Sequence, residues 1–329
     1  MGMVWRQPGT EVAAAVLLRA EILIYDFPAL SHGPLTAVVS LVAEFASEAV
    51  RRGGLDLILR LSARGGASRA LLTIAETWGV PVFFSGEKAR SRGEELLAAR
   101  GAIPADLPDS APPYLRRCPH FAAWWRAQPP GNRLESVDPR LAFQVGPGGS
   151  FVFFWAAKVS IWVAAEGRSK SNEIVFSRPD IHHVVAWHRP PKADFRDTQV
   201  VLVREFRSPG RTTDGFVREV PGGSASKAGD LANHAAREFS EETGFGVDVI
   251  RLKPLGSRQV SATTSTHHAH AFSLKLTAAE MKHVRSLGPA GQREETELTT
   301  TEVYRLGDLL DRPLTDWANL GMILVALQE

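Results

Sequence analysis

Three glutamates that could bind a metal ion stand close together in the C-terminal half of this chain. Glu238, Glu241 and Glu242 are spaced at i, i+3 and i+4 within residues 231–243, a segment compatible with an α-helix throughout. A helix projects side chains with this spacing from one face. Such carboxylates repel one another unless a cation lies among them, and oxygen-only ligation suits Mg²⁺ or Mn²⁺. The alternative is a solvated acidic helix face.

The residues around the glutamates predict where the helix begins and ends. Asp230 is a good N-cap residue, and Gly244 suits the position that follows a helix. Arg237 stands four residues before Glu241 and could orient the carboxylates. Gly222 and Gly223 precede the helix and let the backbone approach a ligand closely, while a helix N-terminus favours anionic groups. The pattern therefore predicts a site for a cation and an anionic ligand.

The whole arrangement resembles the Nudix box, in which a glycine and a loop precede the pattern R-E-apolar-x-E-E-x-G-apolar. The matching residues are Gly223, Arg237, Glu238, Phe239, Glu241, Glu242, Gly244 and Phe245. The resemblance covers about residues 142–329. It implies a hydrolase, dependent on Mg²⁺ or Mn²⁺, that cleaves the diphosphate of a nucleoside diphosphate linked to another moiety. One position departs from the family, because Gly229 stands where a glutamate is expected, with Asp230 beside it.

The resemblance also implies individual roles. The metal ligands would be Glu238, Glu241, Glu242 and the backbone carbonyl of Gly222. The catalytic residues would be Arg237, Glu241, Glu242 and a carboxylate from a later loop, for which Glu295 is chosen over its neighbours Glu294 and Glu297. The alternative for that loop is a solvated acidic surface. Bound metal ions would offset the diphosphate charge and activate a water for in-line attack.

Residues 200–223 resemble the approach to the box in ADP-ribose pyrophosphatases. The matching elements are Glu205-Phe206-Arg207 and Glu219-Val220-Pro221-Gly222-Gly223. The implied substrate contacts are Arg207, Arg218, Glu219 and Gly223, since a guanidinium matches phosphate geometry. Either arginine could instead be a structural surface residue. Ser261 stands where ADP-ribose-specific members carry proline. ADP-ribose is therefore the favoured substrate, but other nucleotide sugars and dinucleotides stay open.

Histidines gather on both sides of the box. The members are His182, His183, His267, His268 and His270. Histidines close together can bind zinc, but no cysteine cluster and no H-E-x-x-H helix accompanies them. Polar strand or loop residues near the substrate are therefore the favoured interpretation.

The predicted fold class is α/β, with two domains. Residues 1–137 are expected to form a Rossmann-like domain with a parallel sheet, because predicted strands at 21–26, 55–61 and 80–84 alternate with helices. Prolines between 101 and 149 predict a connecting region with a short helix and no long regular element. Residues 138–329 are expected to form a Nudix α/β/α sandwich with a mixed sheet, including strands at 151–164, 173–176, 182–187 and 199–206.

The N-terminal domain carries a fainter resemblance. Residues 55–84 resemble nucleoside 2-deoxyribosyltransferase-like domains, but Arg69 lies where the catalytic glutamate is expected, and Glu76 follows two turns later. A ligand-binding or assembly role is favoured. Two alternatives to a simple hydrolase stay open. One is a Nudix module that senses an ADP-ribose-like ligand with little or no catalysis. The other is a two-step enzyme whose N-terminal carboxylate, Asp26, Asp56 or Glu76, acts on an N-glycosidic bond.

Bulk properties exclude several classes of protein. A length of 329 residues fits two domains, and a formal net charge of +2 gives no reason to expect a nucleic-acid partner. Cys118 is the single cysteine, so an internal disulfide framework and cysteine-rich zinc sites are excluded. Arg19 and Glu21 interrupt the most apolar early stretch, and no signal-peptide pattern is visible. We expect a cytoplasmic enzyme with a small-molecule nucleotide substrate, no membrane association and, by analogy with related pyrophosphatases, a possible homodimer.

Overall fold

The computed structural model describes most of the chain from residue 104 onward and three short strands before it. The described residues are 22–25, 58–60, 82–84, 104–111, 113–145, 151–224, 230–290 and 298–328. The chain divides into two compact units. Unit 1 comprises Met1–Arg178 and Thr263–Thr266, and unit 2 comprises Pro179–Ala262 and His267–Glu329. Asp138, where the sequence placed the domain boundary, lies within a strand of unit 1.

The N-terminal strands of unit 1 are parallel. β1 (Ile22–Tyr25) lies between β2 (Ile58–Arg60) and β3 (Val82–Phe84) and pairs with both. The helices expected between these strands lie outside the described residues, so the Rossmann-like assignment stays a prediction. The candidates Asp26, Asp56, Arg69 and Glu76 lie outside them too.

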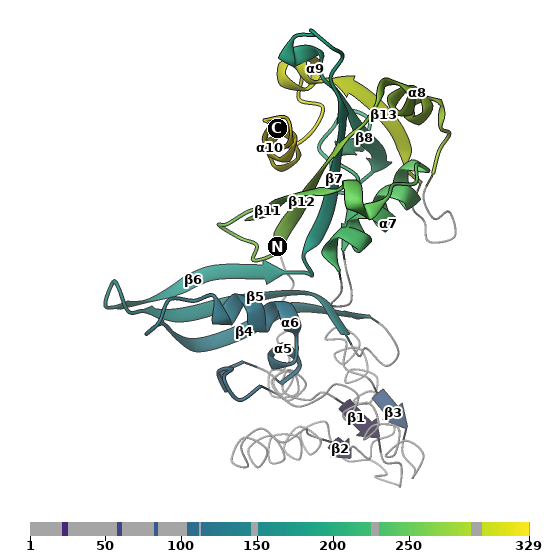
Figure 1. Cartoon of the computed structure of the whole chain (residues 1–329). Helices are drawn as coiled ribbons and strands as arrows, with labels where there is room; N and C mark the ends of the chain where they lie inside the picture. The colour runs from purple at the N-terminus through teal and green to yellow at the C-terminus, as the bar shows by residue number, and fades with distance from the viewer. Residues whose placement is uncertain are drawn as a thin grey trace. The chain divides into compact units, whose positions relative to one another are not determined.

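The rest of unit 1 is an antiparallel sheet covered by two short helices (Figure 1). The elements are α5 (Pro113–Arg116), α6 (Pro119–Arg126), β4 (Arg133–Val145), β5 (Phe151–Val163) and β6 (Arg168–Ser177). Phe121 of α6 and Trp155 of β5 lie in its core. The expectation that prolines forbid a long element here is wrong, because β4 contains Pro139. β4 is an edge strand whose register shifts between Pro139 and Leu141, and proline is tolerated at such positions.

Unit 2 is built on a mixed sheet. Its strands are β7 (Ile181–His188), β8 (Gln199–Phe206), β9 (Phe216–Glu219), β10 (Gly222–Ser224), β11 (Lys253–Gln259), β12 (His268–Lys275) and β13 (Thr300–Arg305). The order is β11-β12-β7-β8-β13, with β10 paired to β7 and β9 paired to β8. The β7–β12 pair is parallel and the others are antiparallel. The expected mixed sheet is therefore confirmed.

Helices cover both faces of this sheet (Figure 1). The helical elements are η2 (Phe195–Asp197), α7 (Leu231–Thr243), η3 (Val249–Arg251), α8 (Ala278–Ser286), α9 (Leu306–Asp311) and α10 (Trp317–Ala326). Val201 of β8 packs with Phe239 of α7, whereas its neighbour Leu202 packs with Ile323 of α10. Alternate residues of a strand point to opposite faces, so odd and even positions of β8 serve different cores. We call these faces the α7 face and the α10 face. No helix of the described residues is long and apolar enough to cross a membrane.

Candidate functional site

Helix α7 has the boundaries that its capping residues predict. The Asp230 side chain accepts a hydrogen bond from the backbone N–H of Ala232 at 2.9 Å, which satisfies an otherwise unpaired donor of the first turn. Gly244 ends the helix with a φ of 72°, a left-handed conformation that favours glycine. Phe239 and other apolar residues anchor one side of α7 in the core. The predicted helix is confirmed.

The glycines of β10 lie directly against the glutamates of α7. The backbone N–H of Gly222 donates to Oε2 of Glu242 at 2.8 Å. A Cβ atom on Gly223 would stand 2.2 Å from Oε2 of Glu238, which is closer than any real contact. Any side chain larger than hydrogen at position 223 would therefore displace the Glu238 carboxylate. The glycines and glutamates of the sequence motif therefore also lie together in space.

Glu242 lies in surroundings that oppose its negative charge. Burial is the main cause that raises the pKa of its carboxyl group to about 8, and the neighbouring Glu238 and Glu205 raise it further. The hydrogen bond from Gly222 and the charge of Arg207 act in the opposite direction. Without a further cation, this carboxyl group is therefore mainly protonated at neutral pH.

Arg207 joins this cluster from the end of β8. Its guanidinium lies 2.9 Å from Glu205 and 3.3 Å from Glu219, two residues on neighbouring strands. Glu205 is only 8% exposed. It shares the odd parity of Val201 and so lies on the α7 face, with Glu242. The sequence indicates Glu205 only as part of a motif. Strand alternation places it on the same face as Val201, and that face is known only from the packing of the sheet.

Arg237 holds the outer part of the cluster. Its guanidinium lies 2.8 Å from Glu238 and 3.8 Å from Glu241. The second contact spans one helical turn, as the spacing predicts. Arg237 therefore bridges two of the three glutamates, and Glu242 is left to Gly222 and to the charge of Arg207.

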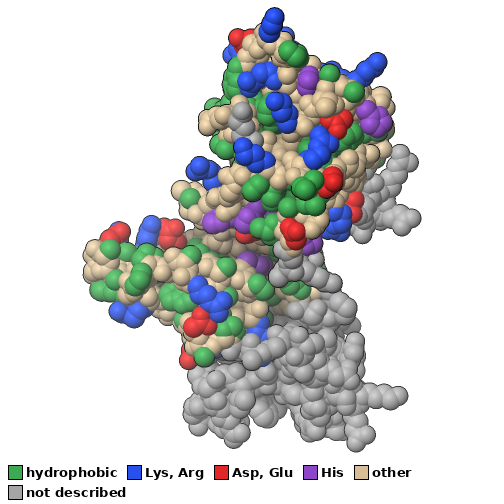
Figure 2. Space-filling model, viewed as in Figure 1, with side chains coloured by type: hydrophobic (Ala, Val, Ile, Leu, Met, Phe, Trp, Pro, Cys, Tyr) green, Lys and Arg blue, Asp and Glu red, His purple; other side chains and the backbone are tan. Residues whose placement is uncertain are grey.

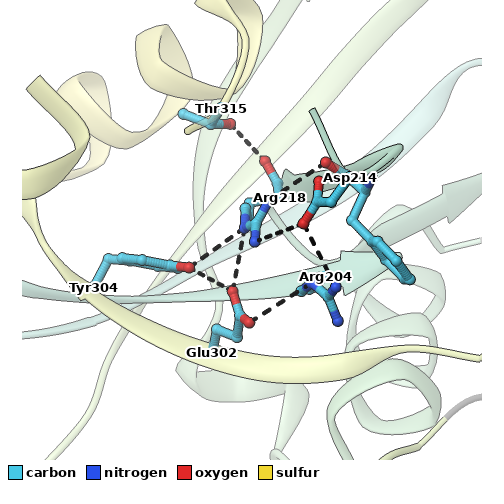
Figure 3. Close-up of polar contacts among 7 residues, drawn as sticks. Arg204, Asp214, Arg218, Glu302, Tyr304 and Thr315 are labelled. Atoms are coloured by element: carbon cyan, nitrogen blue, oxygen red, sulfur yellow. Dashed lines mark hydrogen bonds and ion pairs between the residues drawn. The ribbon is translucent and has the colours of Figure 1, made fainter. Parts of the chain in front are cut away.

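Arg218 lies in a different network. Its Nε atom is 3.4 Å from both Glu302 Oε2 and the Tyr304 hydroxyl, which donates to the same carboxylate oxygen at 2.5 Å (Figure 3). Asp214 lies 3.6 Å from both Arg218 and Arg204. The backbone carbonyl of Arg218 accepts from Thr315 Oγ1 at 2.6 Å.

The sheet separates this network from the glutamates. Arg218 pairs in register with Arg204, an even position of β8, whereas Glu219 pairs with Val203. Tyr304 packs with the α10-face core, and Arg218 contacts Tyr304. Of the two arginines expected at the substrate, only Arg207 therefore shares a face with Glu242, whereas Arg218 lies on the α10 face. The sequence alone does not separate the two arginines, because the face on which a given position of a strand lies is known only once the packing is known.

Histidines form a stack on the α7 face. The ring of His182 lies 5.2 Å from that of His270 and 6.2 Å from that of His234, between centroids. His270 Nε2 lies 2.9 Å from Asp180. Burial and the two neighbouring imidazoles lower the pKa of His182, whose Nδ1 has no hydrogen-bond partner among the described residues. Figure 2 shows histidine side chains at several places on the visible surface.

The atoms of the glutamate cluster that could bind a metal ion are all carboxylate or backbone oxygens, and Mg²⁺ and Mn²⁺ prefer oxygen ligands. Each of these carboxylates is already engaged: Glu205 contacts Arg207, Glu238 contacts Arg237, and Glu242 accepts from the backbone N–H of Gly222. Within the described ranges, no three His, Cys, Asp or Glu side chains are already arranged to hold a metal ion. The cluster thus offers suitable ligand types and a surplus of negative charge rather than a preassembled coordination shell.

Several predicted positions lie outside the described residues. They are Gly229 and the loop carboxylates Glu294, Glu295 and Glu297. The chain was also compared with known proteins: no protein-family model matches it, and no curated protein matches it.

Proposed function

We propose that unit 2 is a Nudix-type hydrolase that uses Mg²⁺ or Mn²⁺ to cleave the diphosphate of a nucleoside diphosphate linked to another moiety. The observation that carries the proposal is the contact between the two glycines and the glutamates. Gly222 donates its N–H to Glu242, and Gly223 leaves room for the Glu238 carboxylate. Two motif segments separated by a loop in the sequence thus meet at one site.

The charges of the cluster support a role for a divalent cation. Five carboxylates, those of Glu205, Glu219, Glu238, Glu241 and Glu242, share two guanidiniums, those of Arg207 and Arg237. Burial is the main cause of the raised pKa of Glu242, and the charges of Glu238 and Glu205 raise it further. Glu238, Glu241 and Glu242, with the backbone of Gly222, would hold the ion. When bound, it would supply charge neutralisation and activation of water.

The remaining residues would bind and orient the substrate. Arg207 presents a guanidinium beside the glutamates, and such a group can bind a phosphate through two parallel hydrogen bonds. Glu219 holds Arg207 on one side, and Arg237 fixes the directions of Glu238 and Glu241. Gly223 would act through Glu238, because the space left by its missing side chain holds that carboxylate.

ADP-ribose is the favoured substrate within this class, by the resemblance of residues 200–223 to ADP-ribose pyrophosphatases. Arg207 rather than Arg218 is the phosphate contact in this proposal. Arg218 already bonds Glu302 and Tyr304 on the α10 face. Ser261, in place of the proline of ADP-ribose-specific members, keeps other nucleotide sugars and dinucleotides in the class to be tested.

A second candidate is a sensor that binds such a ligand without efficient hydrolysis. The observation that favours it is the way in which the carboxylates are already engaged. Arg237 holds Glu238 and Glu241, and the Gly222 N–H holds Glu242, so a metal ion would have to displace these partners. Binding and turnover must therefore be measured separately.

The test is a Mg²⁺-dependent hydrolysis screen over ADP-ribose, other nucleotide sugars and dinucleotides. We expect turnover by the wild type, and a loss of at least about a hundredfold in Glu241→Gln and Glu242→Gln, because each removes a ligand of the ion that activates the water. Glu166→Gln, in a turn of unit 1 where the Glu166 carboxylate pairs with Arg168, serves as a matched control with unchanged rate.

No turnover of any compound, or equal turnover by the wild type and both variants, would contradict the hydrolase proposal. Calorimetric binding of a ligand without hydrolysis would select the sensor instead.

A further inference from the structure

We propose that His183 and Asn319 are positioning residues, which hold the peptide groups of Val220 from two sides and thereby keep Gly222 and Gly223 against the glutamates of α7. The part of this inference that concerns metal binding rests on the proposed function. Neither residue belongs to the glutamate cluster, and the sequence alone predicts no such role for either.

The backbone of Val220 is fully engaged. Its N–H donates to Asn319 Oδ1 at 2.8 Å, and its carbonyl lies 3.1 Å from His183 Nδ1. A carbonyl can only accept, so His183 carries its proton on Nδ1 and donates it. The next carbonyl, that of Pro221, accepts from the backbone N–H of Val184 at 2.9 Å. Val220 itself is 1% exposed, so water cannot replace these partners.

Asn319 can present its oxygen to Val220 because its other groups are fixed. Its Nδ2 donates to Asp316 Oδ1 at 2.9 Å, and its backbone N–H donates to the same oxygen at 2.8 Å, which caps α10. The amide nitrogen therefore faces Asp316, and the amide oxygen is directed at Val220. Asn319 is 5% exposed. This side chain thus ties the start of α10 to a segment far away in the sequence.

His183 also packs directly on the glycine that contacts Glu242. A Cβ on Gly222 would lie 2.6 Å from His183 Nδ1 and 2.2 Å from the carbonyl oxygen of His182. Gly222 is therefore confined between β7 on one side and Glu242 on the other. A hydrogen bond weakens steeply when its distance or angle changes, so a small shift of this segment would release Glu242.

The chain offers a matched pair of variants at position 183. His183→Asn keeps a nitrogen donor near the position of Nδ1, whereas His183→Leu fills the space without a donor. Asn319→Leu removes the acceptor of the Val220 N–H and leaves a buried donor unpaired, which is costly and could unfold the protein. The positioning role is therefore tested mainly by comparing His183→Leu with His183→Asn. Asn319→Leu is added if circular dichroism shows that it folds.

The experiment measures amide hydrogen exchange across residues 219–224 and Mn²⁺ affinity by electron paramagnetic resonance on the full chain. In His183→Leu, we expect faster exchange of the Val220 and Gly222 amides and about tenfold weaker Mn²⁺ binding, as for the loss of other groups that orient metal ligands. His183→Asn should stay close to the wild type in both. We also expect kcat to fall more than KM rises, because the segment orients ligands of the reacting centre.

Unchanged exchange and Mn²⁺ affinity in a folded His183→Leu would overturn the inference. Equal losses in His183→Leu and His183→Asn would overturn it too, because the donor would then not matter. If the wild type neither binds Mn²⁺ nor hydrolyses any compound, the proposed function fails. The exchange comparison still decides the positioning role in that case, since it needs no metal.

Discussion

The carboxyl group of Glu242 couples the charge of the candidate site to the stability of the fold. Its pKa is about 8 in the folded chain, against 4.5 in an exposed side chain. The folded state therefore binds this proton more tightly than the unfolded state does. The resulting stabilisation is complete below pH 4.5 and is lost as the pH rises through about 8.

We therefore predict that Glu242→Gln stabilises the metal-free protein at alkaline pH. The neutral amide escapes the charge penalty, so the free energy of unfolding should exceed that of the wild type by about 1–3 kcal/mol at pH 8.5. At pH 5 the difference should nearly vanish. Urea unfolding in the presence of a chelator measures it. A difference that is the same at both pH values would exclude titration of Glu242 as its cause.

Individual residues of the site differ in how far the sequence predicts them. Glu238, Glu241 and Glu242 follow from spacing alone, because helical geometry converts i, i+3 and i+4 into one face. Arg207 and Arg218 cannot be separated in this way, since the two faces of the sheet are defined by packing against α7 and α10, which lie elsewhere in the chain. Asn319 has no local signal, because its partner Val220 lies elsewhere in the chain.

Helix α8 shows how one carboxylate can stabilise an element of unit 2. Thr277 and Glu280 form a capping box, in which each side chain bonds the backbone N–H of the other. Glu280 also bonds Arg251 of η3 at 2.7 Å. The Arg251 hydrogen bond is the main cause that lowers the pKa of Glu280 to about 2. One side chain therefore caps α8 and ties it to η3.

We predict that Glu280→Gln lowers the free energy of unfolding by about 1–2 kcal/mol at pH 7, as for the loss of a cap and a partly exposed ion pair. A lowered carboxyl pKa stabilises the fold fully above pH 4.5, and this contribution is lost as the pH falls toward 2. Thermal unfolding at pH 7 and pH 2.5 should show a difference in stability between the wild type and Glu280→Gln that is smaller at pH 2.5. Glu166→Gln again provides a comparison at a surface ion pair, and an equal loss there would contradict a special role of Glu280.

Regular elements with local signals are predicted well from the sequence. Capping residues define α7, and β8 has the predicted bounds, Gln199–Phe206. β9 and β10 are too short to show a hydrophobic period, so they depend on pairing with β8 and β7. β4 was missed because Pro139 argues locally against a strand, and the sequence does not show that the strand lies at an edge.

At the scale of the whole molecule, the described residues form separate hydrophobic cores. Trp155 lies in the core of unit 1, and Trp187 lies in the α10-face core of unit 2. Trp187 also donates to Ser273 Oγ at 2.9 Å. Both side chains are buried in cores that share no residue.

We predict that Trp155→Phe and Trp187→Phe each destabilise the chain by about 1–3 kcal/mol, because each leaves a cavity. The double variant should lose the sum of the two within about 0.5 kcal/mol, as for sites without shared partners. Denaturant unfolding followed by circular dichroism measures all three. A double variant that departs from the sum by more than about 1 kcal/mol would show that the two cores are coupled.

The alternation along β8 and β9 has a consequence for how this chain can change in length. Glu205 and Glu219 contact Arg207 on the α7 face, while their immediate neighbours Arg204 and Arg218 contact Glu302 on the other face. Inserting or deleting one residue within either strand would turn its side chains over. Guanidiniums would then replace carboxylates beside α7. The site would be lost even though the sequence still contained all of its residues. Length variation among relatives should therefore fall in the turn after Arg207 and spare both strands.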